Sequence, residues 1–161
     1  MAKKLSQLMP DLKAALEDGM RDAATDITNE LKRRSPYWSG DVERGWQVVQ
    51  GQEPVPNDLP GRDLSEVPER LPRPSQPSPI VGGVPEPDLS KGYAIGNRME
   101  YVDYAADLAP WSDNRDGTLR YEHPGADQGA EPRWWTRYVQ GGEMQVTVQQ
   151  AMERQKRAKG F

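Results

Sequence analysis

The chain has no cysteine, only one histidine and only one phenylalanine among its 161 residues. Without cysteine there are no disulfides, no thiolate nucleophiles and no cysteine-based zinc sites. The single histidine, His123, excludes any site that needs a histidine pair. A serine hydrolase built on Ser35 or Ser39 would have to use this same histidine as its base. His123 lies in the turn-like context Tyr-Glu-His-Pro-Gly, which is typical of an exposed loop residue.

Long apolar runs are also missing. No segment approaches the roughly 18 apolar residues of a membrane-spanning helix. The first residues lack the apolar segment of a secretory signal. We therefore expect a protein that is made and used in a cytosol and has no membrane partner.

Charge is unevenly distributed along the chain, whose net charge is −4. Residues 1–34 carry seven basic and six acidic side chains, and residues 153–161 carry four and one. Ten basic and eighteen acidic side chains remain between 35 and 152, a local charge of −8. This acidic middle argues against binding to a phosphate backbone, which needs an excess of lysine and arginine.

The first third of the chain has a helical pattern. Apolar residues recur at three- and four-residue steps, at Leu5, Leu8, Leu12, Leu16, Met20, Ala24, Ile27 and Leu31. This spacing predicts one amphipathic helix of about thirty residues, and we expect its regular part to begin near Pro10. Lys32-Arg33-Arg34 places positive charge at its C-terminal end, and Ser35-Pro36 stops it. We interpret the basic triplet as a helix cap and not as a nucleic-acid site.

The middle of the chain predicts short strands and a long insert. Val42–Val49 and Gly92–Gly96 have the composition of strands, and Ile80-Val81 would add a short third. Between Pro54 and Pro87 the chain holds ten of its fifteen prolines. Neither a helix nor a central strand tolerates this density. We expect 51–90 to be an extended proline-rich insert, ordered mainly by whatever it touches.

The last third predicts two further helices. Asn97–Leu108 has a mixed apolar pattern that favours a short helix, and 110–132 reads as a turn-rich loop. Trp134–Lys159 predicts a final helix that is interrupted or kinked at Gly141-Gly142. The expected fold is a single α+β domain over 1–161, in which a long N-terminal helix and a C-terminal helix pack on a small antiparallel sheet.

Five tryptophans stand out in a chain this poor in phenylalanine. Large aromatic side chains often anchor interfaces, although here they could equally compensate for the shortage of phenylalanine in the core. We expect Trp46 and Trp135 to be core residues. Trp38, Trp111 and Trp134 are expected to lie partly at subunit contacts.

Catalytic and metal-binding patterns are absent from the sequence. The segment 113–117 has the sequence Asp-Asn-Arg-Asp-Gly, but a calcium loop would place a ligand where Arg115 stands. A simple turn explains it. Isolated glycines form no phosphate-binding loop. We therefore predict no enzyme activity, no cofactor and no metal.

Three segments resemble the neck or tail-completion proteins at the head–tail junction of long-tailed bacteriophages. In the first, the long helix runs into residues 34–46, R-S-P-x-x-S-G-x-x-x-x-G-W. In the second, residues 95–105, I-G-N-x-x-x-Y-V-x-Y-A, are similar to that family's strand ending in asparagine before a tyrosine–alanine helix. The third is the charged C-terminal helix. Two features depart from the family: 107–110 (D-L-A-P) stands where an acidic residue and a glycine are common, and the proline-rich insert is longer than expected.

The resemblance implies a structural protein without catalytic residues. It implies a ring of identical subunits, six in number, between the head-closure connector and the tail-terminator or tail-tube proteins. Genome DNA would pass through without specific binding, since an acidic lining repels phosphates. Such a protein is made in the host cytoplasm and resides in the virion. Tyr101 and Tyr104 join the three tryptophans as candidate subunit-interface residues.

Three other functions stay open at this stage. A tail terminator has a similar α+β ring architecture and caps the tail tube. A small cytosolic adaptor could use the long helix and the proline-rich segment to bind a partner. A hydrolase or nuclease would need its acidic clusters to bind a divalent metal.

Overall fold

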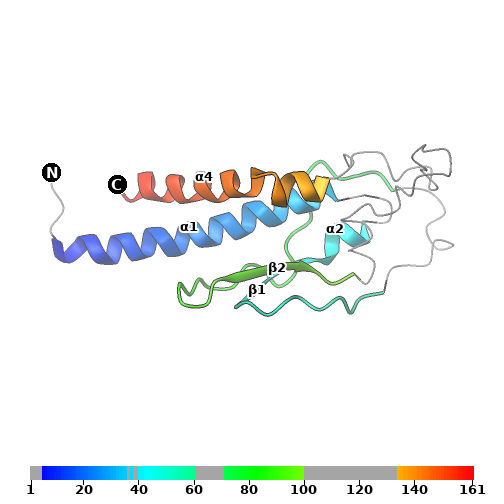
Figure 1. Cartoon of the computed structure of the whole chain (residues 1–161), viewed down its shortest axis with the longest axis horizontal. Coiled ribbons are helices and arrows are strands. Elements are labelled where there is room, and N and C mark those ends of the chain that lie inside the picture. Colours follow the sequence, from blue (N-terminus) through cyan, green and yellow to red (C-terminus); the bar gives the residue numbers. More distant parts are fainter. Residues whose placement is uncertain (1–4, 36, 38–39, 61–70, 100–133) are drawn as a thin grey trace.

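The computed structural model describes residues 5–35, 37, 40–60, 71–99 and 134–161. Its elements are α1 (Leu5–Arg34), α2 (Asp41–Gly45), β1 (Trp46–Gln50), β2 (Tyr93–Asn97), the π-helical turn η1 (Thr136–Gln140) and α4 (Glu143–Ala158). Figure 1 shows α1 lying between α4 on one side and the two strands on the other. The predicted α+β class is confirmed.

Helix α1 is the predicted amphipathic helix, but it begins at Leu5 and continues through Pro10. The expected start near Pro10 is therefore wrong. Proline lacks the N–H that would bond to the carbonyl group four residues earlier, which belongs to the exposed Ser6. Since that carbonyl can be hydrated, the helix loses little there. The helix ends with Lys32, Arg33 and Arg34 in its last turn, as predicted.

Helix α4 packs antiparallel along α1 (Figure 1). Basic side chains near the end of the chain pair with acidic side chains of α1. Arg154 lies 2.6 Å from the carboxylate of Asp26. The two helices lie close together at Gly19, where an added Cβ would come within 2.6 Å of the sulfur of Met152. The predicted break at Gly141-Gly142 is confirmed: Gly142 has φ 93° and separates η1 from α4.

The segment predicted as a strand over Val42–Val49 is in fact a helical turn followed by a strand. Gly40 enters α2 with φ 81°, a conformation that glycine adopts without steric cost. This turn places Val42 in the core, and the chain becomes extended only at Trp46. The sequence pattern gave no sign of this because a single turn is too short to show helical periodicity.

Within the described residues the sheet has two antiparallel strands, paired from Trp46↔Asn97 to Gln50↔Tyr93. The second strand was predicted almost to the residue. The third, at Ile80-Val81, is wrong: the N–H of Gly83 donates to the carbonyl of Ile80 at 2.9 Å, which closes a turn.

The helix predicted over Asn97–Leu108 does not begin at Asn97. Asn97 ends β2, and Met99 makes an isolated parallel bridge with Leu59. The rest of that predicted helix lies outside the described residues.

The described parts of the proline-rich insert have no helix or strand beyond that bridge, as predicted. They nevertheless pack on their own domain. Val55 is buried against Gly96, where an added Cβ would come within 2.6 Å of the valine Cβ. Asp58 pairs with Arg98 through two contacts of 2.7 and 2.9 Å. These contacts order the described flanks of the insert within a single chain.

The core lies where the C-terminal end of α1 meets α2, the sheet and η1. It is built from Ile27, Leu31, Val42, Trp46, Met99, Trp134 and Tyr138. The indole rings of Trp46 and Trp135 stack at 5.9 Å with an interplanar angle of 15°. In the described part of the chain no helix has both the length and the apolar character required to cross a membrane.

Candidate functional site

The residues that carried the motif at 34–46 form a buried joint after α1. The hydroxyl of Ser35 donates to the carbonyl of Leu31 at 2.6 Å and accepts the indole N–H of Trp46 at 2.8 Å. Ser35 therefore ends the helix and also satisfies the one polar group of the central core tryptophan. Trp46 is the first residue of β1, and its hydrogen bond to Ser35 ties the start of this strand to the end of α1. The motif at 34–46 therefore sets the direction of β1 relative to α1.

The second motif meets the first at Asn97. Its side-chain amide donates to the carbonyl of Val42 at 2.7 Å, and its side-chain oxygen accepts the N–H of Met99 at 2.9 Å. Gly45 lies directly against it, since a Cβ added there would be 2.2 Å from that oxygen. Only a residue without a side chain leaves room for Asn97 at position 45, so the glycine of the first motif and the asparagine of the second depend on each other.

A buried charged pair fastens the proline-rich insert to this joint. Lys32 is fully buried, and its ammonium group donates to Ser78 O at 3.0 Å, Ser78 Oγ at 3.1 Å and Pro79 O at 3.1 Å. The carboxylate of Glu43 accepts the N–H of Ser78 at 2.7 Å and its hydroxyl at 2.9 Å. Ser78 thus lies between two opposite charges that have both been removed from water.

Burial has an electrostatic consequence at Lys32. Removal from water lowers its pKa below the ordinary value of 10.5, and the negative charge of Glu43 works in the opposite direction. All three donors of the ammonium are already engaged within the chain. This lysine is therefore a structural cation with no donor left for an anionic ligand.

Two further contacts hold the insert along α1. The guanidinium of Arg73 donates to the backbone carbonyls of Arg33 and Ser35 and lies over the ring of Tyr37, 5.1 Å from its centroid. The side chain of Arg21, near the middle of α1, pairs with Glu86. The segment 71–90 therefore runs back along α1, attached near its C-terminal end and near its middle.

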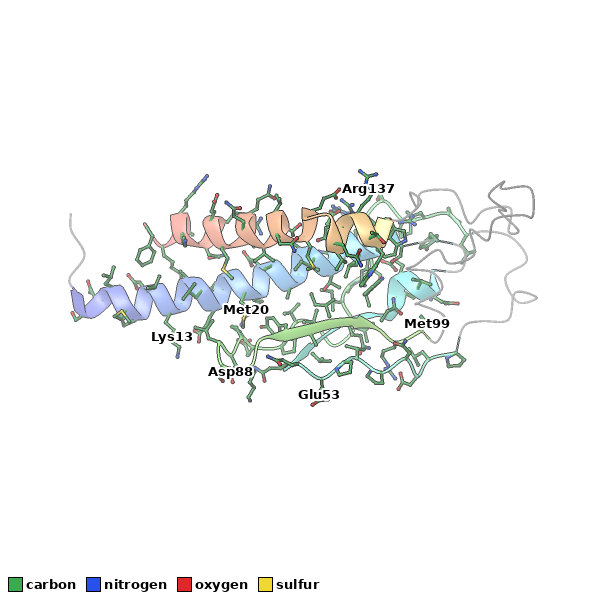
Figure 2. The ribbon with its side chains drawn as sticks, viewed as in Figure 1. Lys13, Met20, Glu53, Asp88, Met99 and Arg137 are labelled. Atoms are coloured by element: carbon green, nitrogen blue, oxygen red, sulfur yellow. The ribbon has the colours of Figure 1, made fainter. Side chains whose placement is uncertain are left out.

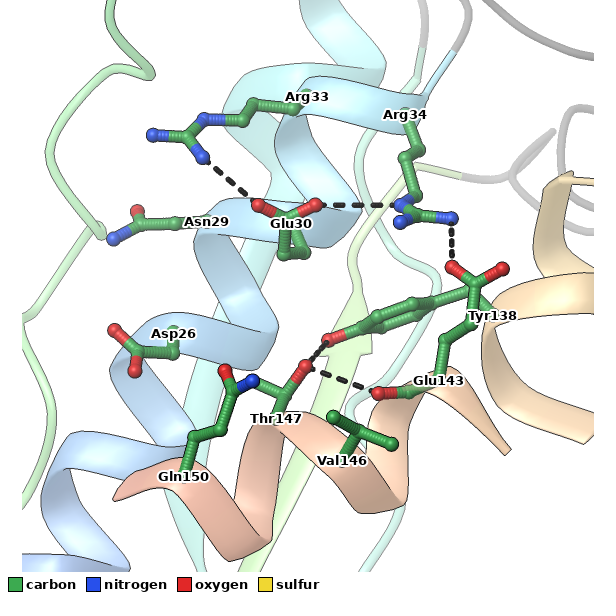
Figure 3. Close-up of a pocket in the computed structure, with 10 residues that line it drawn as sticks. All are labelled: Asp26, Asn29, Glu30, Arg33, Arg34, Tyr138, Glu143, Val146, Thr147 and Gln150. Carbon is green, nitrogen blue, oxygen red and sulfur yellow. Dashed lines mark hydrogen bonds and ion pairs between the residues drawn. The ribbon is translucent and has the colours of Figure 1, made fainter. Parts of the chain in front are cut away.

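A groove of ≈ 500 Å³ lies between α1 and α4. Figure 3 shows its ion pairs: Glu30 contacts Arg33 at 2.8 Å and Arg34 at 3.3 Å, and Arg34 reaches Glu143 at 2.7 Å. The guanidinium of Arg34 also lies 4.6 Å from the ring centroid of Tyr138.

These contacts account for two pKa shifts in the groove. Although partial burial acts in the opposite direction, hydrogen bonds to Glu143 and Glu30 raise the pKa of Arg34. Burial raises the pKa of Tyr138, whose hydroxyl lies 3.3 Å from that of Thr147. The polar groups at the base of the groove thus bind one another, and Val146 remains 52% exposed at its edge.

The predicted interface residues are only partly described. Trp38, Tyr101, Tyr104 and Trp111 lie outside the described residues, as does His123.

Trp134 was predicted to lie partly at a subunit contact, but its side chain is only 2% exposed. It packs edge-on against Trp135, with ring centroids 5.8 Å apart, so it belongs to the core of its own chain. Trp46 is a core residue as predicted. Trp135 is half-buried and packs against the core. Adjacent positions of a helix point about 100° apart, and the sequence alone did not show which of the two faces inward.

The buried pair of Lys32 and Glu43 could not be predicted from the sequence pattern. Lys32 was interpreted as one of three capping cations, yet it lies one turn after the buried Thr28 on the core-facing side. That position was the only sign of its burial. Neither Glu43 nor Ser78 shows any sign of this contact in the sequence, because the two residues lie 35 positions apart.

Within 5–35, 40–60, 71–99 and 134–161, no cluster of three or more acidic, histidine or cysteine side chains is placed to hold a metal ion. The polar network of the joint consists of satisfied structural contacts. No family model, curated protein or solved structure matches the chain.

Proposed function

We propose that this chain is a structural subunit of the head–tail junction of a long-tailed bacteriophage, of the neck or tail-completion type. In this proposal, copies form a ring between the head-closure connector and the tail, and the protein catalyses no reaction. It is made in the host cytoplasm and resides in the virion.

The observation that carries the proposal is the meeting of the two motifs that resemble this family. They are far apart in the sequence, yet Trp46 pairs with Asn97, and Gly45 lies against the same asparagine. Because the two motifs contact each other in space, they support a local structure shared with the neck or tail-completion family better than two motifs without contact would. A long helix, α1, precedes the joint in the chain and a charged helix, α4, follows it, as the resemblance implies.

In the ring that we propose, the sheet side of the subunit faces the channel. Figure 2 shows Glu53 and Asp88 on the sheet side, pointing away from the helices, whereas Arg137 points outward on the α4 side. Asp58, also in the insert, is about half exposed. Asp58 pairs with Arg98, and Asp88 pairs with Lys91 at 3.5 Å, so repulsion of passing phosphates by this side would come from Glu53 more than from these two. In a ring of like-oriented subunits, neighbours meet through two different surfaces.

The first test is direct imaging of the purified protein over a range of concentrations. We expect closed rings with a central opening by electron microscopy, and we expect this chain at the junction in a virion map. A protein that remains monomeric at all concentrations and is missing from mature particles would refute the proposal. The diameter and position of the ring would separate a neck protein from a tail terminator.

The insert needs a narrower test than removal of residues 54–87. That deletion would remove Ser78 and leave Lys32 and Glu43 buried without their shared partner, so a loss of assembly could reflect misfolding. A deletion confined to residues 61–70 keeps the described anchors at Arg73, Ser78 and Glu86. If the insert docks on a neighbouring subunit or ring, this shorter deletion should weaken assembly while the monomer remains folded. Normal virions from this variant would contradict a docking role.

A further inference from the structure

Part of the proline-rich insert, residues 71–86, lies along α1, and we call it the strap. Three of its residues contact α1 or α2 through hydrogen bonds or ion pairs: Arg73, Ser78 and Glu86. None of its residues is buried. Among the described residues, none of the side chains that form the hydrophobic core or pack against it comes from the strap. The strap is therefore held by polar contacts and adds nothing to the core.

The stripe of α1 that the strap contacts is polar. It consists of residues at three- and four-residue steps, which lie on one side of the helix: Arg21, Thr25, Thr28 and Lys32. The hydroxyls of Thr25 and Thr28 donate to carbonyls of α1 itself, at 2.9 and 2.7 Å, so they need no partner in the strap. Removing the strap would therefore uncover no apolar stripe. Of these four side chains, the two cationic ones are those that would lose a partner.

The turn between the strap and β2 is complete in itself. The N–H groups of Lys91 and Gly92 donate to the carbonyl of Asp88 at 3.0 and 3.1 Å. Gly92 has φ 73°, and the position that a Cβ would take there is open. Dihedral changes at this glycine can therefore swing the strap away from α1 while β2 stays paired with β1.

We propose that the strap opens as a unit while the rest of the domain stays folded, and that it thereby controls access to Lys32 and Glu43. In the closed state both charges are removed from water and bind Ser78. In the open state both are hydrated, which offsets part of the contacts that are lost. Opening also exposes little apolar surface, so it should respond less to denaturant than unfolding of the core does. The device belongs to the single chain and does not depend on the proposed function.

Native-state hydrogen exchange of the full chain tests the opening. The N–H of Ser78 donates to the carboxylate of Glu43 at 2.7 Å, so it exchanges when the strap opens. The reference is the amide of Leu31, a core residue inside α1. After correction for intrinsic rates, we expect the Ser78 amide to exchange at least about a hundredfold faster than the Leu31 amide, with a weaker dependence on urea. Equal protection and equal urea dependence would mean that the strap opens only when the core unfolds, and would overturn the proposal.

Acetylation of lysine side chains gives an independent measurement of access. The amine of Lys32 is buried at the strap, whereas the side chain of Lys13 is 69% exposed. Acetic anhydride should modify Lys13 at once and Lys32 slowly, while near-UV circular dichroism shows that the core stays folded. Ser78→Ala removes the hydroxyl that contacts both charges, so it should speed the acetylation of Lys32 about tenfold. The matched control Ser75→Ala, at an exposed serine of the strap, should leave the rate unchanged.

Two results of the acetylation experiment would contradict the proposal. One is modification of Lys32 only at urea concentrations that unfold the core. The other is an equal rate in Ser78→Ala and in the wild type. The exchange measurement uses the wild-type chain, so it decides the question even if Ser78→Ala folds poorly.

Discussion

The hydroxyl of Ser35 offers the sharpest test of the joint. Ser35 is fully buried, and its hydroxyl is the acceptor for the indole N–H of Trp46. Ser35→Ala leaves this N–H inside the core without that acceptor. The carbonyl of Leu31 loses the hydroxyl but keeps the backbone N–H of residue 35 at 2.9 Å, so only the indole is left unsatisfied. A buried unsatisfied donor costs about 1–3 kcal/mol.

The assay is thermal unfolding followed by far-UV circular dichroism. For a chain of this size, each 1 kcal/mol corresponds to about 2–4 °C in Tm, so a loss of about 2–12 °C is expected. Ser75→Ala, at an exposed serine of the insert, is the matched control and should stay within about 0.5 kcal/mol of the wild type.

Repeating Ser35→Ala in the Trp46→Phe variant separates the loss of the hydrogen bond from any change in how the side chain of residue 35 packs. Trp46→Phe removes the indole N–H, so Ser35→Ala should cost less in that variant than in the wild type, with a coupling energy of about 1 kcal/mol. Equal losses in the two backgrounds would show that the serine does not act through the tryptophan, and the reasoning about the joint would fail.

Three further changes test other contacts. Gly45→Ala places a methyl group 2.2 Å from the side-chain oxygen of Asn97 and should lower the unfolding free energy by about 1–3 kcal/mol in thermal melts. Burial lowers the pKa of Lys32 below 10.5, so the unfolded chain binds more protons between that lowered value and 10.5. The stability of the wild type relative to Lys32→Met should therefore rise with pH across this window in urea titrations; a constant difference would contradict the assignment. Arg34→Ala breaks a partly exposed pair with Glu143 and should cost about 1 kcal/mol, less at high salt, whereas a salt-independent loss would point to packing alone.

The helices and the second strand could be predicted because their signals are local and repeated. The apolar spacing from Leu5 to Leu31 identifies α1, and Gly141-Gly142 marks the break before α4. The start of the first strand could not be predicted. A five-residue helical turn such as α2 is set by Gly40 and by the contacts of Val42, and leaves no periodic trace in the sequence.

The candidate site could be predicted only in outline. The motifs indicated a joint, but the sequence did not show that Asn97 fits against Gly45, because that contact depends on strand register. Burial of Lys32 depends on Ser78, which comes from the middle of a segment without regular structure. The proline-rich composition correctly predicted that the described parts of the insert would lack helices and strands apart from one bridge, but it contained no information about which surface they would pack on.

The first and last helices of the described chain pack against each other, and this arrangement constrains how the molecule is made. Trp46 leaves the ribosome long before Trp135, the ring on which it stacks. At about 5–20 residues per second, α1 spends several seconds without the helix that covers its apolar face. We therefore expect the nascent chain to be a chaperone client until α4 has been synthesised and can pack on α1.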